Sequence, residues 1–291
     1  MPEVSDQRGP DGEFRIEAHA ARAWPAASAV PVDGWLLRHT AGVLRRRSNS
    51  VLPPLGPSPG LPPDQSPAGE PGRQAGPLER VIAAAEEFYA GLGLPVVVQV
   101  TPAGRRRDLD AFLHRRGYAR AAPTLVLTGS AAQVARGAVA DGAVAGPAAA
   151  RDVPEPVEVT DGPDQEWSRA FAILDDHPDS AQVAETVIGA ITLPVGCARL
   201  RVGSEIAGIG LFVGGGPAAG AFCVATAPSY RRRGVASAIM AAGARWAAER
   251  GSQTLYLQVE ESNRAARTLY DRLGLSVSHG YHYRIAPPPA G

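Results

Sequence analysis

The stretch Arg231-Arg232-Arg233-Gly234-Val235-Ala236 decides the fold of this chain. It follows an apolar, strand-like run over residues 221–226 and precedes a helical pattern over residues 237–250. The first turn of a helix has backbone N–H groups without intrahelical acceptors, and the helix dipole favours negative charge there. Gly234 removes the side chain where the backbone must approach an anion, and Ala236 keeps a second position small. With three arginines beside it, this strand, turn and helix start predict a site for a phosphorylated ligand.

Two other phosphate-binding patterns are excluded. A Walker A loop needs a lysine after its second glycine, and this chain has no lysine, so all 29 of its basic residues are arginine. A Rossmann fingerprint needs G-x-G-x-x-G after the first strand of a βαβ unit, and that pattern is absent at this point. The remaining pattern is R-x-x-G-x-[GA], from Arg231 to Ala236.

A second motif follows about 30 residues later. Residues 254–259 are expected to form a buried strand, and residues 264–273 a helix that ends at Gly274. Asn263 is a good N-cap, and it stands two helical turns before Tyr270, so the two side chains project to nearly the same face. The apolar stripe of this helix consists of Ala266, Leu269, Tyr270 and Leu273.

Together these motifs resemble those of the GNAT superfamily of acetyl-CoA-dependent N-acetyltransferases. The string N-R-A-A-R-T-L-Y-D-R-L-G-L is similar to the signature N-x-x-A-x-x-L-Y-x-x-x-G-[FL], and the resemblance covers residues 156–285. It implies an α/β fold with a mixed, mostly antiparallel sheet flanked by helices. It also implies transfer of an acetyl group from acetyl-CoA to a primary amine, by direct attack in a ternary complex and with no metal.

The resemblance also assigns roles to residues of this chain. Strand 221–226 is expected to splay from strand 254–259 so that the pantetheine arm lies between them. Tyr270 is the expected general acid that protonates the leaving thiolate. The expected contacts to coenzyme A are Val224, Ala225, Thr226, Arg231, Arg232, Arg233, Gly234, Val235, Ala236, Ser237 and Asn263.

The general base is less defined. Related acetyltransferases carry a glutamate where this chain has Gln258, which cannot take a proton. Glu260 lies two residues further and points to the same side of an extended strand, so it is the first candidate. His177 lies in the segment that usually shapes the acceptor pocket, Glu205 is expected in a hairpin turn, and deprotonation through water stays open.

The chain is expected to hold two domains and a linker. Residues 1–128 are predicted to form a degenerate GNAT-like domain, 129–155 an Ala/Gly-rich linker and 156–291 the catalytic domain. Expected elements include strands over 34–38 and 44–52, and the Pro/Gly-rich loop 53–77 is expected to be disordered. In an ungapped register Leu113 matches Tyr270 and Arg106 matches Asn263. A fragment of residues 156–291 is therefore expected to bind acetyl-CoA alone.

Composition limits the partners. The formal net charge is zero, which argues against nucleic acid, and no apolar run approaches the length of a membrane span. The two cysteines lack metal-ligand spacing. We expect a cytoplasmic enzyme with an amine acceptor, either a small molecule or a protein amine; the sequence determines neither the acceptor nor the oligomeric state. Three alternatives stay open: an acyltransferase with another acyl-CoA donor, a CoA-binding regulatory module without turnover and, ranked last, a nucleic-acid binder. The third would use the arginine clusters 45–47, 105–107 and 231–233.

Overall fold

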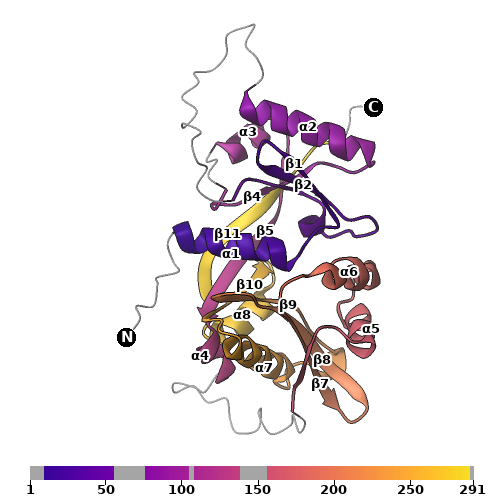
Figure 1. The fold of residues 1–291 in the computed structure, drawn as a ribbon, viewed down its shortest axis with the longest axis vertical. Helices are drawn as coiled ribbons and strands as arrows, with labels where there is room; N and C mark the ends of the chain where they lie inside the picture. The colour runs from indigo at the N-terminus through magenta and orange to yellow at the C-terminus, as the bar shows by residue number, and fades with distance from the viewer. Residues whose placement is uncertain (1–9, 56–75, 105–107, 138–155, 289–291) are drawn as a thin grey trace. The chain divides into compact units, whose positions relative to one another are not determined.

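The computed structural model describes residues 10–55, 76–104, 108–137 and 156–288, and shows two compact units (Figure 1). Unit 1 comprises residues 1–17, 26–123 and 281–291, and unit 2 comprises residues 18–25 and 124–280. Within the two units the strand pairs are antiparallel except for β3 with β4 and β9 with β10. The expected α/β class, with a mostly antiparallel sheet flanked by helices, is confirmed.

Unit 1 is built on the strand order β1-β2-β3-β4-β11. The pairs are antiparallel, antiparallel, parallel and antiparallel in that order. Helix α2 connects the two parallel strands. The elements are α1 (Pro10–Ala23, shared with unit 2), β1 (Ser28–Val32), β2 (Trp35–His39), η1 (Arg46–Ser48), β3 (Val51–Leu52), α2 (Pro77–Gly91), β4 (Val97–Val100), α3 (Leu109–Arg115) and the end of β11 (Ser276–Ile285).

Unit 2 contains the order β6-β7-β8-β9-β10-β5. Here α7 connects the parallel strands β9 and β10. The elements are β5 (Ala119–Ser130), α4 (Ala131–Ala135), β6 (Glu158–Asp161), α5 (Gln165–Leu174), α6 (Ser180–Thr186), η2 (Ile188–Ala190), β7 (Val195–Val202), β8 (Glu205–Val213), β9 (Ala218–Thr226), η3 (Pro228–Tyr230), α7 (Val235–Glu249), β10 (Thr254–Glu260), α8 (Arg264–Arg272) and the start of β11.

The two units share one pairing pattern. The series β7-β8-β9-β10-β5 is antiparallel, antiparallel, parallel and antiparallel, which is the pattern of β1-β2-β3-β4-β11. A crossover helix joins each parallel pair, and a short helix follows the second parallel strand, α3 in unit 1 and α8 in unit 2. This repeat of topology supports the prediction that the N-terminal half is GNAT-like.

Each unit is completed by a strand from the other half of the sequence. Residues Thr124–Ser130 of β5 pair with all of β10, and His282–Ile285 of β11 pair with β4. The compact units therefore differ from the expected boundaries 1–128 and 156–291, because backbone hydrogen bonding, which composition does not reveal, unites distant segments. The expected linker also starts with structure, since Gly129 and Ser130 end β5 and α4 packs on α7.

One predicted strand is wrong in most of its length. Of residues 44–52 only Val51 and Leu52 form a strand, and a 3-10 turn, η1, precedes them. The side chain of Asn49 explains this: its Oδ1 accepts from the Thr40 N–H at 2.9 Å, and its Nδ2 donates to the Val43 carbonyl at 2.6 Å. These bonds offer the backbone an alternative to a strand ladder. The expected disorder in loop 53–77 falls mainly on residues 56–75, outside the described residues.

Helix α7 covers one face of the unit 2 sheet at close range. A Cβ at Gly208 would lie 2.5 Å from Cγ1 of Val235, and one at Gly243 would lie 2.1 Å from the Phe212 ring, so only glycine permits this approach. Tyr270, on α8, belongs to the same buried cluster as α7 residues such as Ile239. Helix α5 contacts β8 and β9, so it lies on the opposite face, with α6 beside it (Figure 1).

Candidate functional site

The parallel strands β9 and β10 pair over only part of their length. The register runs from Ala218↔Thr254 to Ala221↔Leu257, although β9 continues to Thr226 and β10 to Glu260. A β-bulge in β9 accounts for this: Leu211 of β8 faces Phe222 and Ile209 faces Ala225, so two residues of β9 oppose Gly210. The parallel ladder between these fully described strands therefore ends at Ala221 and Leu257, and the two strands part beyond it.

The bulge has an unusual backbone conformation. Cys223 has a φ of +52°, in the left-handed region that a side chain disfavours. Beyond it, Val224 packs against the cluster under α7 and α8, and Thr226 pairs with Gly208, which faces α7. Ala225 consequently faces the α5 side. The segment predicted to hold pantetheine thus pairs with β8 and lies where β9 and β10 part.

The predicted phosphate loop leads directly into α7. Arg231, Arg232 and Arg233 are all exposed, and Arg232 has a φ of +62°. Gly234 is the N-cap of α7 with a φ of +84°, so its left-handed conformation is the second reason for glycine here. The Arg233 guanidinium lies 5.7 Å from the centre of the Tyr230 ring, and the Tyr230 hydroxyl donates to Glu205 at 2.8 Å. Glu205 is therefore tied to the loop rather than free in a turn.

We expect Gly234→Val to weaken acetyl-CoA binding by at least ~10-fold, because a branched Cβ blocks the backbone's approach to phosphate and strains the left-handed cap. Gly251→Val is a matched control: Gly251 follows the other end of α7, has a φ of +86° and has open space at its Cβ position. Both variants should lose stability of roughly 1–2 kcal/mol from strain alone. Calorimetry showing equal acetyl-CoA affinity for the two variants would contradict the phosphate site.

The second motif places Asn263 and Tyr270 on one helix. Asn263 caps α8, its Oδ1 accepting from the Ala266 N–H at 3.1 Å. Tyr270 is 9% exposed, and burial raises its pKa to about 12. The Tyr270 hydroxyl bonds to no other described residue. Among the described residues, every fully buried side-chain oxygen has a hydrogen-bond partner. The Tyr270 hydroxyl is therefore not fully buried, and solvent reaches it. The ring is buried, and the hydroxyl makes no hydrogen bond within the described residues that would occupy its proton.

Glu260 lies on the other face of β10. Leu257 and Val259 point into the cluster that holds Tyr270, so Gln258 and Glu260 point toward the α5 side. The Glu260 carboxylate is exposed and has no hydrogen-bond or ion-pair partner among the described residues. Tyr270, the expected proton donor, and Glu260, the candidate base, therefore lie on opposite faces of the sheet where β9 and β10 part.

An interaction of α1 was missed by the sequence reasoning. The Nε2 atom of His19 lies 3.0 Å from the Gly214 carbonyl, which only accepts, so Nε2 carries the proton and Nδ1 accepts from the Tyr256 hydroxyl at 2.7 Å. Burial lowers the pKa of His19, which favours this neutral form. Tyr256 also contacts Phe222 edge to face. The N-terminal helix therefore helps to cover the α5 face of β9 and β10.

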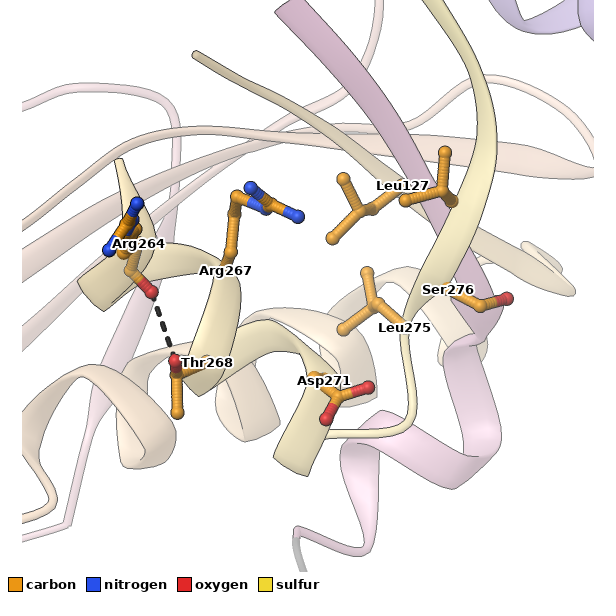
Figure 2. A pocket seen from close by; sticks show the side chains of 8 residues that line it. Leu127, Arg264, Arg267, Thr268, Asp271, Leu275 and Ser276 are labelled. Carbon is orange, nitrogen blue, oxygen red and sulfur yellow. Dashed lines mark hydrogen bonds between the residues drawn. The ribbon is translucent and has the colours of Figure 1, made fainter. Parts of the chain in front are cut away.

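A pocket of about 520 Å³ lies against the outer side of α8 (Figure 2). It contains none of the residues predicted to bind coenzyme A, so the parting of β9 and β10 remains the better candidate site. Among the described residues, no group of three His, Cys, Asp or Glu side chains is arranged to hold a metal. The pocket is lined by Leu127, Arg264, Arg267, Thr268, Asp271, Leu275, Ser276 and Val277.

Comparisons with known proteins agree with this geometry. Residues 140–275 match the model of the acetyltransferase (GNAT) family. The chain is 25% identical over 281 residues to the uncharacterized N-acetyltransferase YobR of Bacillus subtilis (strain 168), covering 93% of this chain and 97% of YobR. Among solved structures, a GCN5-related N-acetyltransferase from Kribbella flavida superposes with a TM-score of 0.62 at 14% identity, covering 96% of each chain.

A tandem GNAT protein from the clavulanic acid biosynthesis pathway superposes with a TM-score of 0.52 at 16% identity, over 76% of this chain and 73% of that one. At these identities the solved structures show the fold. The family model, over residues 140–275, and the similarity to YobR support an acyltransferase of the GNAT type. Within the described ranges no helix is both long and apolar enough to span a membrane.

Proposed function

We propose that unit 2 binds acetyl-CoA where β9 and β10 part and transfers the acetyl group directly to a primary amine in a ternary complex. The observation that carries this proposal is the position of the parted strands, which lie between an open helix N-terminus and a buried tyrosine. Val224, Ala225 and Thr226 supply backbone bonds to the pantetheine arm. Residues 231–237 supply N–H groups and arginines to the phosphates, and Asn263 steadies the turn before α8 or bonds coenzyme A.

Tyr270 then protonates the thiolate that leaves as coenzyme A. A pKa near 12 keeps its proton in place at neutral pH until the sulfur becomes basic enough to take it. Acetyl-CoA brings an activated acyl group, and the protein contributes orientation and proton transfer. No covalent acetyl-enzyme is needed, because the amine attacks from the α5 side while the thiolate leaves toward Tyr270.

We propose that the N-terminal half is a GNAT-like domain that no longer binds coenzyme A. In unit 1 the parallel strands β3 and β4 pair only at Val51↔Val98, and β3 ends before Pro53, which has no N–H to donate. A Cβ at Gly104 would lie 2.7 Å from Cγ of Pro53. The chain of unit 1 is therefore closely packed after β3 and β4, whereas the corresponding strands of unit 2, β9 and β10, part. Leu113, the counterpart of Tyr270, is fully buried. Arg106, the counterpart of Asn263, lies outside the described residues.

Steady-state kinetics with acetyl-CoA and a panel of primary amines tests this function. The panel should include amino acids, polyamines, aminoglycosides and peptides with a free N-terminus or lysine. We expect amine-dependent release of coenzyme A, one acetylated product per thiol, and intersecting initial-rate patterns. Parallel patterns with an isolable acetyl-enzyme would reject direct attack. Preference for a longer acyl-CoA would favour the other-acyl-donor alternative, and binding without turnover across the panel would favour a regulatory module.

A further inference from the structure

The loop between α5 and α6 holds a histidine–aspartate pair. Nδ1 of His177 lies 2.5 Å from Oδ1 of Asp179, whose side chain is only 1% exposed, whereas the His177 side chain is 41% exposed. A carboxylate accepts and does not donate, so Nδ1 carries the proton in this contact. Whenever the imidazole is deprotonated at Nε2, that lone pair is the one available on the exposed side of the ring.

Several hydrogen bonds join the residues of the loop around this pair. The Ser180 hydroxyl lies 2.5 Å from Oδ2 of Asp175 and 2.8 Å from the His177 carbonyl, and the Ser180 N–H also donates to that carbonyl. Asp176 has a φ of +52°, in the left-handed region that aspartate tolerates better than most residues. Ser180 is 1% exposed. These contacts hold His177 in place, although its ring is open to solvent.

Helix α5 brings the loop to the β9 side of the sheet. The helix starts over β7, where its N-cap Asp164 contacts Arg199 at 2.5 Å and the Trp167 indole donates to the Ala198 carbonyl at 3.0 Å. Arg199 is in register with Ile209, which is in register with Ala225 beside the bulge. From there α5 reaches β9, which it contacts. The ten residues of α5 span ~15 Å along the helix axis, whereas β9 lies only two strand spacings, or ~10 Å, from β7. Its C-terminal loop thus follows on the face toward which Glu260 points.

We propose that His177, oriented by Asp179, is the base that accepts the proton of the acceptor ammonium or of the attacking amine. This inference rests on the proposed acetyl transfer. The amine nitrogen forms its bond to the acetyl carbon, its proton passes to Nε2 of His177, and the carbon–sulfur bond breaks as Tyr270 protonates the thiolate. Product release and exchange with water restore both side chains.

The structure favours His177 over Glu260 because of orientation. A third group holds the imidazole in one tautomer, which is the usual support of a histidine base. Glu260 has no such support among the described residues. The other carboxylates of the loop are Asp175 and Asp176, and no ionisable side chain except Asp179 makes a hydrogen bond or ion pair with the His177 ring among the described residues.

The test compares His177→Gln, Asp179→Asn and Glu260→Gln on a verified amine, using His114→Gln and Glu261→Gln as exposed controls. His177→Gln should lower kcat/KM by roughly 10²–10⁴-fold and remove an ionisation from the acid limb of its pH profile, because the base works only when deprotonated. Asp179→Asn should lower it by roughly 10-fold or more with the acetyl-CoA affinity retained. Imidazole should partly restore His177→Ala.

An unchanged profile and no imidazole rescue would overturn the proposal. If only Glu260→Gln shows these effects, Glu260 is the base, as the sequence predicts. If both histidine and glutamate variants keep the wild-type profile, water accepts the proton. Calorimetry with acetyl-CoA separates these results from failure of the proposed function, since loss of donor binding by the wild-type chain would reject the function itself.

Discussion

Replacing Tyr270 with phenylalanine should lower kcat by roughly 10²–10⁴-fold, the usual share of a general acid. The ring packs in the cluster beneath α7, and only the solvent-reached hydroxyl is removed, so the fold and the acetyl-CoA affinity should persist. Tyr118→Phe is the matched control, because Tyr118 is also a buried tyrosine and its hydroxyl donates to Glu86 of unit 1. Single-turnover measurements show whether the chemical step is the one that slows.

Tyr270→Ala separates the ring from the hydroxyl. Loss of this largely buried aromatic side chain should cost about 3–5 kcal/mol of unfolding free energy, whereas Tyr270→Phe should cost far less. Wild-type turnover by Tyr270→Phe, with chemistry rate-limiting, would make Tyr270 a packing residue. The thiolate would then take its proton from water or from the ammonium product.

The second large effect concerns the expected catalytic fragment. Residues 156–291 lack β5, which pairs with β10 along Thr254–Glu260, and lack Leu127, Ala131 and Val134 of the core under α7. They also lack His19, the acceptor for the buried Tyr256 hydroxyl. We therefore expect this fragment to expose a long strand edge and to be poorly folded or aggregated. On these contacts we expect that the fragment does not bind acetyl-CoA by itself, in contrast to the expectation from the sequence.

Circular dichroism and thermal unfolding of three chains measure this effect. The full chain should unfold cooperatively, residues 156–291 should not, and residues 124–280, which restore β5 and α4, should recover part of the structure. A cooperative transition and acetyl-CoA binding by residues 156–291 would show that β5 is dispensable. Residues 124–280 lack residues 18–25 of unit 2. The difference in stability between this fragment and the full chain would therefore include the contribution of α1 to unit 2.

Local signals explain what the sequence predicted well. The glycine turn at Gly234, the Asn263 cap and the apolar stripe of α8 depend on neighbours within a few residues, and each lies where the sequence predicts it. The mixed sheet followed from a family resemblance carried by the same motifs. The roles of these residues in binding and catalysis stay predictions.

Long-range pairing could not be predicted in the same way. Nothing near Thr124 indicates that its strand pairs with Glu260, and nothing near His19 indicates a bond to Tyr256. The bulge at Cys223 also lacks a local signal, because it has no glycine and arises from the register with β8. For His177 the sequence offered the residue, but the fold supplied its orientation by Asp179.

Hydrogen–deuterium exchange of the intact chain, with and without saturating acetyl-CoA, tests the central claim most directly. Donor binding at the parted strands predicts protection of the amides of residues 224–226 and 232–237, to which the donor would bond. It predicts no protection in residues 97–104 of unit 1, where the chain is closely packed against Pro53. Protection confined to unit 1, or unchanged exchange over residues 224–237 at saturation, would contradict the assignment of the donor site to the parted strands β9 and β10.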